Sequence, residues 1–113
     1  MKNNIGEILQ KARDTYGNRN QIMVAIEELN ELACVLAKYP RYEEHEKAVE
    51  ELKEKTLDEV ADVTIVLNHI CNIFELDFDT DIQPRMDKKA ERLERWLEKS
   101  NSIEQTTVDR EVN

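Results

Sequence analysis

The chain has little glycine, proline or aromatic side chain. Its 113 residues include two glycines and two prolines, and tight β-hairpin turns depend heavily on glycine. The remainder is rich in Glu, Lys, Leu and Ala, which are good helix formers. The sequence therefore predicts an all-α protein rather than one built on a β-sheet. The length suits one domain, since a typical domain has roughly 100 to 150 residues.

Basic charge and long apolar runs are also scarce. The chain has 16 Lys and Arg against 25 Asp and Glu, a net charge of -9. Binding of a nucleic acid polymer depends on neutralising phosphates with Lys and Arg, so such a partner is disfavoured. An acidic chain can still bind a small polyanion if metal ions lie between them. No apolar run approaches the roughly 20 residues of a membrane span, and we expect no membrane partner.

Cysteine is limited to Cys34 and Cys71, without a Cys-x-x-Cys motif. Each lies in an apolar helical stretch, so we expect buried free thiols, which fit a reducing compartment. The first residues, Met-Lys-Asn-Asn, lack the apolar core of a signal peptide. The expectation from both features is a cytoplasmic protein.

Apolar spacing predicts four helices. The first covers about 5–12, with Asn3 or Asn4 as its cap and Gly17 as its stop, and the second covers 22–36. The third, 60–74, is apolar on most sides and should lie centrally. The fourth covers about 82–97, with Asp81 as its N-cap and a packing stripe of Met86, Ala90, Leu93 and Leu97. Residues 41–55 remain open: a loop, a short surface helix, or the start of the third helix. We expect one domain over 1–99 and a flexible tail over 100–113.

Carboxylates form the most informative pattern. Glu28 and Glu31 lie one turn apart on the second predicted helix, and Glu59 and Asp62 do so on the third. Both pairs lie on strips that are otherwise largely apolar, which is unlike a solvated face. If the strips face each other, the carboxylates converge, and their repulsion requires a counter-charge. Oxygen ligands favour Mg²⁺, with Mn²⁺ as a substitute.

These acids also have other possible explanations. A di-iron site would need Glu-x-x-His pairs, and neither His45 nor His69 follows these acids at that spacing. Glu-x-x-Glu is common on helices by chance, and Thr56-x-x-Glu59 is itself a possible capping box. Either pair alone favours these ordinary explanations, whereas the two matched pairs together favour a metal site.

Positive charge gathers on the fourth predicted helix. One face carries Arg85, Lys88, Arg92 and Lys99, together with Trp96. Such a face can be a solvated surface with salt bridges, but beside a metal cluster it suits a triphosphate, with Lys or Arg binding the free oxygens. Lys55 joins the acidic strip if the third helix begins early enough. If the helix begins later, Lys55 lies in a loop, and the sequence does not indicate where its side chain points.

The motifs resemble those of a known family. Glu27-Glu28-Leu29-Asn30-Glu31, followed after 27 residues by Glu59-Val60-Ala61-Asp62, resembles the signature of the MazG-like all-α nucleoside triphosphate pyrophosphohydrolases. Tyr16-Gly17 followed by Gln21 is similar to small, phage-type members. Lys55, Lys88 and Arg92 fall where these proteins place phosphate-contacting residues. The resemblance covers about residues 5–97.

The resemblance implies a Mg²⁺-dependent enzyme that cleaves a nucleoside triphosphate between the α and β phosphates. Glu28, Glu31, Glu59 and Asp62 would bind metal, and one of them or Glu27 would act as general base. Lys55, Lys88 and Arg92 would contact phosphates, while Arg85 is added from charge alone. The implied fold is a four-helix core bundle completed by contacts in a homodimer or homotetramer, and the implied role is house-cleaning of nucleotides. The alternatives are a non-catalytic helical oligomerisation module and a nucleotide-binding regulator.

Overall fold

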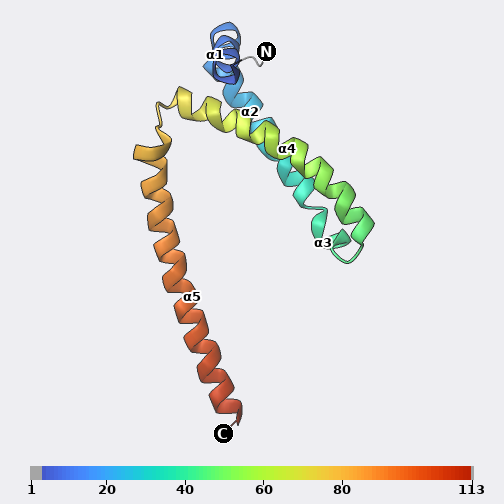
Figure 1. Cartoon of the computed structure of the whole chain (residues 1–113), viewed down its shortest axis with the longest axis vertical. Helices are drawn as coiled ribbons and strands as arrows, with labels where there is room; N and C mark the ends of the chain where they lie inside the picture. Colours follow the sequence, from blue (N-terminus) through green and yellow to red (C-terminus); the bar gives the residue numbers. More distant parts are fainter. Residues whose placement is uncertain (1–3, 113) are drawn as a thin grey trace. The chain divides into compact units, whose positions relative to one another are not determined.

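Helices make up nearly all of the chain. The computed structural model describes the backbone of residues 4–112 and the side chains of residues 4–101. Figure 1 shows the order of the elements, which is α1 (Ile5–Tyr16), α2 (Asn18–Leu36), α3 (Tyr39–Tyr42), α4 (Glu46–Ile73), a π-helical turn η1 (Phe78–Ile82) and α5 (Gln83–Val112). Every regular element in this described part is helical, so the predicted all-α class is confirmed.

The ends of α1 follow directly from its sequence. The Asn4 side chain accepts a hydrogen bond from the Glu7 backbone N–H at 3.3 Å, so the predicted cap is confirmed. At the other end, Gly17 has φ 87° and ψ 157°, a region essentially restricted to glycine. Its N–H still donates to the Arg13 carbonyl at 2.8 Å. Gly17 thereby ends α1 and allows α2 to begin at the next residue.

The core lies between α2 and α4, which pack side by side (Figure 1). The short α3 connects them in the chain. The buried apolar side chains are Ala25 of α2 and Leu52, Val63 and Val66 of α4, together with Leu9 of α1. The helices run in opposite directions because only the short segment with α3 separates them. Such a pair buries one stripe of each helix. The apolar side chains predicted to make α4 central are only partly covered in the single chain: Val63 and Val66 are buried, whereas Val60, Ile65 and Leu67 are 41 to 48% exposed.

The segment left open by the sequence belongs largely to α4. The helix begins at Glu46, so residues 46–55 are its first turns, while α3 occupies Tyr39–Tyr42. Thr56 is therefore inside a helix and not an N-cap, and its hydroxyl donates to the Leu52 carbonyl at 2.7 Å. The capping-box explanation of Glu59 is thus wrong. Lys55 lies one turn before Glu59 on the same helix.

The connection after α4 is built from aspartates. Asp77 caps η1, because its Oδ2 accepts from the Thr80 N–H at 2.9 Å and from the Thr80 hydroxyl at 3.0 Å. Asp81 Oδ2 in turn accepts from the Asp77 N–H at 2.8 Å. Asp81 was predicted to cap the fourth helix, and this prediction is wrong because Asp81 lies inside η1. Pro84 stands in the first turn of α5, as expected.

Backbone contacts divide the chain into two units, Met1–Glu75 and Leu76–Asn113. In the second unit, the predicted packing stripe of α5 is exposed: Met86 by 48%, Leu93 by 60% and Leu97 by 56%. The backbone of α5 is helical to Val112, beyond the predicted end. Side chains after residue 101 lie outside the described part, and the flexible tail stays a prediction, as does the single domain over 1–99.

Two further sequence predictions concern cysteines and membranes. Both cysteines are free, but Cys34 is exposed and Cys71 is partly buried, so the prediction of a buried thiol is wrong for Cys34. Cys34 faces away from the α2–α4 core, which the apolar stretch around it did not reveal. In the part of the chain that the structure describes, no helix is both long and apolar enough to span a bilayer.

Candidate functional site

Carboxylates from α2 and α4 converge in the first unit. Glu28 of α2 and Glu59 and Asp62 of α4 each place one carboxylate oxygen within 4.8 Å of the other two. Glu59 and Asp62 come together because residues three apart lie on the same face of a helix. The opposed packing of α2 brings Glu28 to that face. We call these three residues the carboxylate cluster.

Two oxygens of the cluster are buried without a partner. Glu28 Oε2 and Glu59 Oε2 are inaccessible to solvent and have no hydrogen-bond partner among the described residues. A buried polar atom without a partner destabilises the fold, and more so when it is charged. Two such atoms on facing helices are therefore a departure from ordinary packing. A divalent cation is a suitable partner, because carboxylate oxygens are the ligands that Mg²⁺ and Mn²⁺ prefer.

Electrostatics at the cluster agree with this geometry. Burial raises the pKa of Glu28, and the negative charges of Glu31, Asp62 and Glu59 raise it further. The pKa of Glu59 is raised by burial and then by the charges of Glu31 and Asp62. Both groups therefore resist ionisation in the metal-free chain. A cation among them would stabilise the ionised carboxylates that now repel one another.

The remaining predicted acids lie at the edge of the cluster. Glu31 is exposed on α2 and is not one of the three converging residues, yet its charge acts on both Glu28 and Glu59. Glu27 is also exposed on α2, and the structure does not bring it into the cluster. The structure thus brings together three of the four predicted metal ligands, with Glu31 close by.

The predicted phosphate-binding residues are more widely distributed. Lys55 is exposed on α4 and lines a pocket of about 220 Å³ with Lys38 and Tyr42. Arg85, Lys88 and Arg92 are exposed on α5 in the second unit. Their contact with a triphosphate stays a prediction. Within that unit, Arg92 lines a hollow of about 350 Å³ whose other residues are Arg95, Trp96, Lys99 and Ser100.

Sequence reasoning assigned no role to three buried polar side chains near the cluster, namely Arg13, Gln21 and His69. Arg13 Nη1 donates to His69 Nδ1 at 3.0 Å and to Asn68 Oδ1 at 3.4 Å, which ties α1 to α4. A guanidinium has no acceptor, so Nδ1 of His69 accepts and its proton lies on Nε2. Burial, and then the Arg13 charge, lower the pKa of His69 and keep the ring neutral.

A small pocket connects Gln21 and His69 to the cluster. Its volume is about 130 Å³, and its lining consists of Gln21, Val24, Glu28, Asp62, Ile65, Val66 and His69. The sequence does hold a signal for the two added polar residues. Gln21 precedes Glu28 by seven positions and His69 follows Asp62 by seven, a spacing that keeps residues on one helix face.

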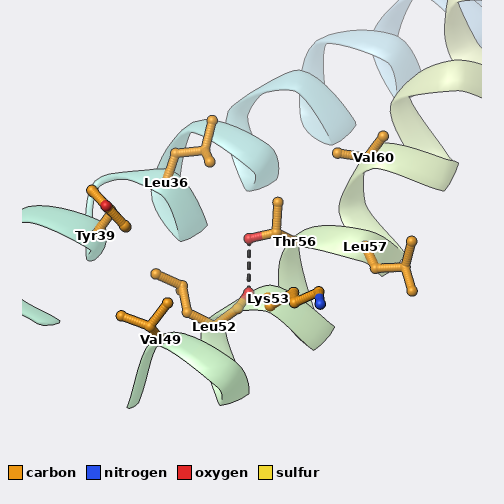
Figure 2. Close-up of a pocket in the computed structure, with 8 residues that line it drawn as sticks. All are labelled: Leu36, Tyr39, Val49, Leu52, Lys53, Thr56, Leu57 and Val60. Atoms are coloured by element: carbon orange, nitrogen blue, oxygen red, sulfur yellow. Dashed lines mark hydrogen bonds between the residues drawn. The ribbon is translucent and has the colours of Figure 1, made fainter. Parts of the chain in front are cut away.

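A larger groove of about 500 Å³ has different chemistry. Figure 2 shows its residues, Leu36, Tyr39, Val49, Leu52, Lys53, Thr56, Leu57 and Val60, which come from α2, α3 and α4. The Thr56 hydroxyl in its wall is already bonded to the Leu52 carbonyl. With few polar atoms toward its interior, this groove is suited to an apolar surface and not to a triphosphate.

Comparison with known proteins finds no significant match to a family model, a curated protein or a solved structure. The resemblance to MazG-like enzymes therefore rests on the sequence motifs alone.

Proposed function

We propose that this protein is a Mg²⁺-dependent nucleoside triphosphate pyrophosphohydrolase, which cleaves an NTP or dNTP between the α and β phosphates to a monophosphate and pyrophosphate. One observation carries the proposal. Glu28 and Glu59, on facing helices of a strongly acidic chain, each bury a carboxylate oxygen without a partner beside Asp62. This is costly to fold and useful for binding a cation.

In this proposal the chain's acids divide into two roles. Glu28, Glu59 and Asp62 hold Mg²⁺ or Mn²⁺, with Glu31 as a fourth ligand. Such a cation neutralises triphosphate charge and lowers the pKa of a water molecule. Glu27 and Glu31 are both exposed on α2, and either can accept a proton from water. Glu31 can take this role only if it does not bind the cation, and Glu27 takes it otherwise.

The basic residues supply the remaining phosphate contacts. Lys55 is one turn from Glu59 on α4, within the reach of a long side chain. Lys88 and Arg92 of α5 are proposed as phosphate contacts on the resemblance alone, and Arg85 is added from its charge. Arg and Lys donors on phosphate oxygens are charge-assisted hydrogen bonds, which are stronger than neutral ones.

A homo-oligomer completes the proposed enzyme. Leu36, Leu57 and Val60 of the first unit and Leu93 and Leu97 of the second are 44 to 61% exposed in the single chain. Exposed apolar patches of this kind mark contact surfaces. A homodimer or homotetramer would cover them and form a four-helix core. We further propose a cytoplasmic role in removing unwanted nucleotides, which is the role that the resemblance implies.

The apolar groove in Figure 2 also supports a second candidate, a non-catalytic helical oligomerisation module. In that case the acidic cluster would have no metal function. The assembly state would then be the same with Mg²⁺ and with EDTA, and no nucleotide would be hydrolysed.

The deciding experiment measures pyrophosphate release from canonical and modified NTPs and dNTPs, with Mg²⁺ and with EDTA, and identifies the nucleotide product by chromatography. Monophosphate and pyrophosphate formed only with metal would support the proposal. A folded chain that hydrolyses no nucleotide in the panel would refute it.

A further inference from the structure

Few buried side chains attach α1 to the rest of the first unit. The buried residues of this helix are Leu9 and Arg13, whereas Ile5 and Ile8 are 66% and 48% exposed. Leu9 supplies an ordinary apolar contact. Arg13 is unusual, because a guanidinium cannot lose its proton in a protein and this side chain is only 8% exposed. One of the two anchors of α1 is therefore a buried cation.

Neutral acceptors bind this buried guanidinium. Its Nη2 donates to Gln10 Oε1 at 3.0 Å within α1. Its Nη1 donates to two residues of α4, to Asn68 Oδ1 at 3.4 Å and to His69 Nδ1 at 3.0 Å. Of these two links to α4, the one to His69 is the shorter. It requires a lone pair on Nδ1, and a doubly protonated imidazole has none.

Protonation of His69 would place two cations at hydrogen-bonding distance. The ring is 3% exposed, so little water is present to screen their repulsion. The other charged groups that face the ring are Glu28 of α2 and Asp62 of α4, which line the same small pocket. Asp62 is seven residues away along its helix, or about 10 Å. Burial and then the Arg13 charge lower the pKa of His69, so these carboxylates do not offset the repulsion.

We propose that the contact between Arg13 and His69 is a pH-sensitive latch, which holds α1 against α4 at neutral pH and opens when His69 binds a proton. The protonated ring cannot accept from Arg13 and repels it, so the buried pair separates and both side chains move into water. Of the two buried side chains of α1, Leu9 alone remains as an anchor, and the helix detaches from α4. The His69 end of the small pocket opens with it.

The direction of the pH effect follows from the proton balance. While α1 is docked, the pKa of His69 lies below the ordinary histidine value of about 6.5. When α1 detaches, the exposed ring returns to that ordinary value. The detached state therefore binds protons more tightly, so docking is fully present above the ordinary value and weakens as the pH falls through it. The raised pKa values of Glu28 and Glu59 act in the opposite sense, but on α2 and α4.

The test is amide hydrogen exchange of the metal-free full chain at pH 7.5 and 5.5, corrected for the intrinsic exchange rate at each pH. Protection of the α1 amides should fall by about 5-fold or more at the lower pH, while protection at Val63 and Val66 in the core should not fall. Unchanged protection of α1, or an equal loss in α1 and the core, would overturn the proposal.

The two histidines of the chain provide a matched pair of variants. Glutamine at position 69 can still accept from Arg13 but does not titrate, so His69→Gln should keep α1 protected at both pH values. His45 is exposed at the start of α4, and His45→Gln should respond to pH as the wild type does. Persistence of the pH response in His69→Gln, or its loss in His45→Gln, would overturn the proposal.

Arg13→Gln gives a second readout that does not require His69→Gln to fold. Without the buried cation, the His69 ring should titrate at a higher pH than in the wild type, as measured by NMR, and α1 should be less protected at pH 7.5. An unchanged titration of His69 in this variant would overturn the latch. None of these measurements involves metal or nucleotide, so the latch and the proposed function stand or fall separately.

Discussion

The α2–α4 pair carries two hollows with opposite chemistry. In the apolar groove, the one hydroxyl of Thr56 is satisfied within its own helix, and Leu52 is buried. At the carboxylate cluster, Glu28 and Glu59 each bury an oxygen that has no partner. The same two helices therefore gain stability from apolar burial at one site and lose stability at the other. Proteins commonly depart from ideal packing at functional sites, and this contrast is why we propose the cluster, and not the groove, as the functional site.

The largest effect is expected from a substitution that disrupts the carboxylate cluster and leaves the apolar groove intact. Glu59→Gln keeps the side chain's size but removes one charge, so Mg²⁺-dependent pyrophosphate release should fall by about 100-fold or more, or about 2.7 kcal/mol in the barrier. Asp58→Asn is the matched control, because Asp58 is the adjacent acid, is exposed and lies outside the cluster. Full activity in Glu59→Gln would remove Glu59 from the site.

The second prediction concerns a substitution that disrupts the apolar groove and leaves the carboxylate cluster intact. Leu52 is 7% exposed, so Leu52→Ala should lower the free energy of unfolding by about 2 to 5 kcal/mol. Leu57 lines the same groove but is 61% exposed, and Leu57→Ala should cost less than about 1 kcal/mol in dilute solution. Urea denaturation measures both. Equal costs would contradict the difference in burial between the two leucines.

The third prediction concerns pH. Because the pKa values of Glu28 and Glu59 are raised, the folded chain binds protons more tightly than the unfolded chain. The metal-free protein should therefore gain thermal stability as the pH falls from neutral through these raised values, and lose it as the pH rises. Stabilisation by Mg²⁺ should change in the opposite sense, since protons compete for the same oxygens.

Melting curves between pH 4.5 and 8, with Mg²⁺ and with EDTA, measure both trends. The double variant Glu28→Gln/Glu59→Gln serves as the control and should lose them. Melting temperatures whose pH dependence is the same in the wild type and the double variant would show that the cluster does not titrate in this way.

The smallest expected effect is a gain in stability. Glu28→Gln removes one of the mutually repelling charges, so the metal-free variant should melt at a slightly higher temperature than the wild type. Glu27→Gln makes the same change at an exposed position outside the cluster and should melt as the wild type does. A lower melting temperature for Glu28→Gln in EDTA would show that the charge of Glu28 stabilises the fold.

The sequence predicts the elements whose signals are local. The cap at Asn4, the stop at Gly17 and the apolar stripes of α2 and α4 are set by nearby residues, and the three cluster carboxylates follow from helical spacing. The start of α4 at Glu46 was not predictable, because its first turns are rich in Glu and Lys and show only a weak apolar stripe.

Features that depend on tertiary packing were predicted less well. The contact between Arg13 and His69 joins residues 56 positions apart, so nothing local predicts it. Helical spacing correctly placed Glu31 near the cluster but could not show that it stays exposed at the edge. The exposure of Cys34 and Leu93 likewise depends on which helix faces find a partner, and apolar spacing alone does not say which faces those are.

The most direct test of the central claim is a calorimetric titration of the metal-free protein with Mg²⁺ at neutral pH, in parallel for the wild type, Glu59→Gln and Asp58→Asn. Our account predicts saturable binding to the wild type and to Asp58→Asn, and a loss of about 10-fold or more in affinity for Glu59→Gln. Equal affinity in all three proteins, or no binding by the wild type, would contradict the assignment of the carboxylate cluster as a metal site.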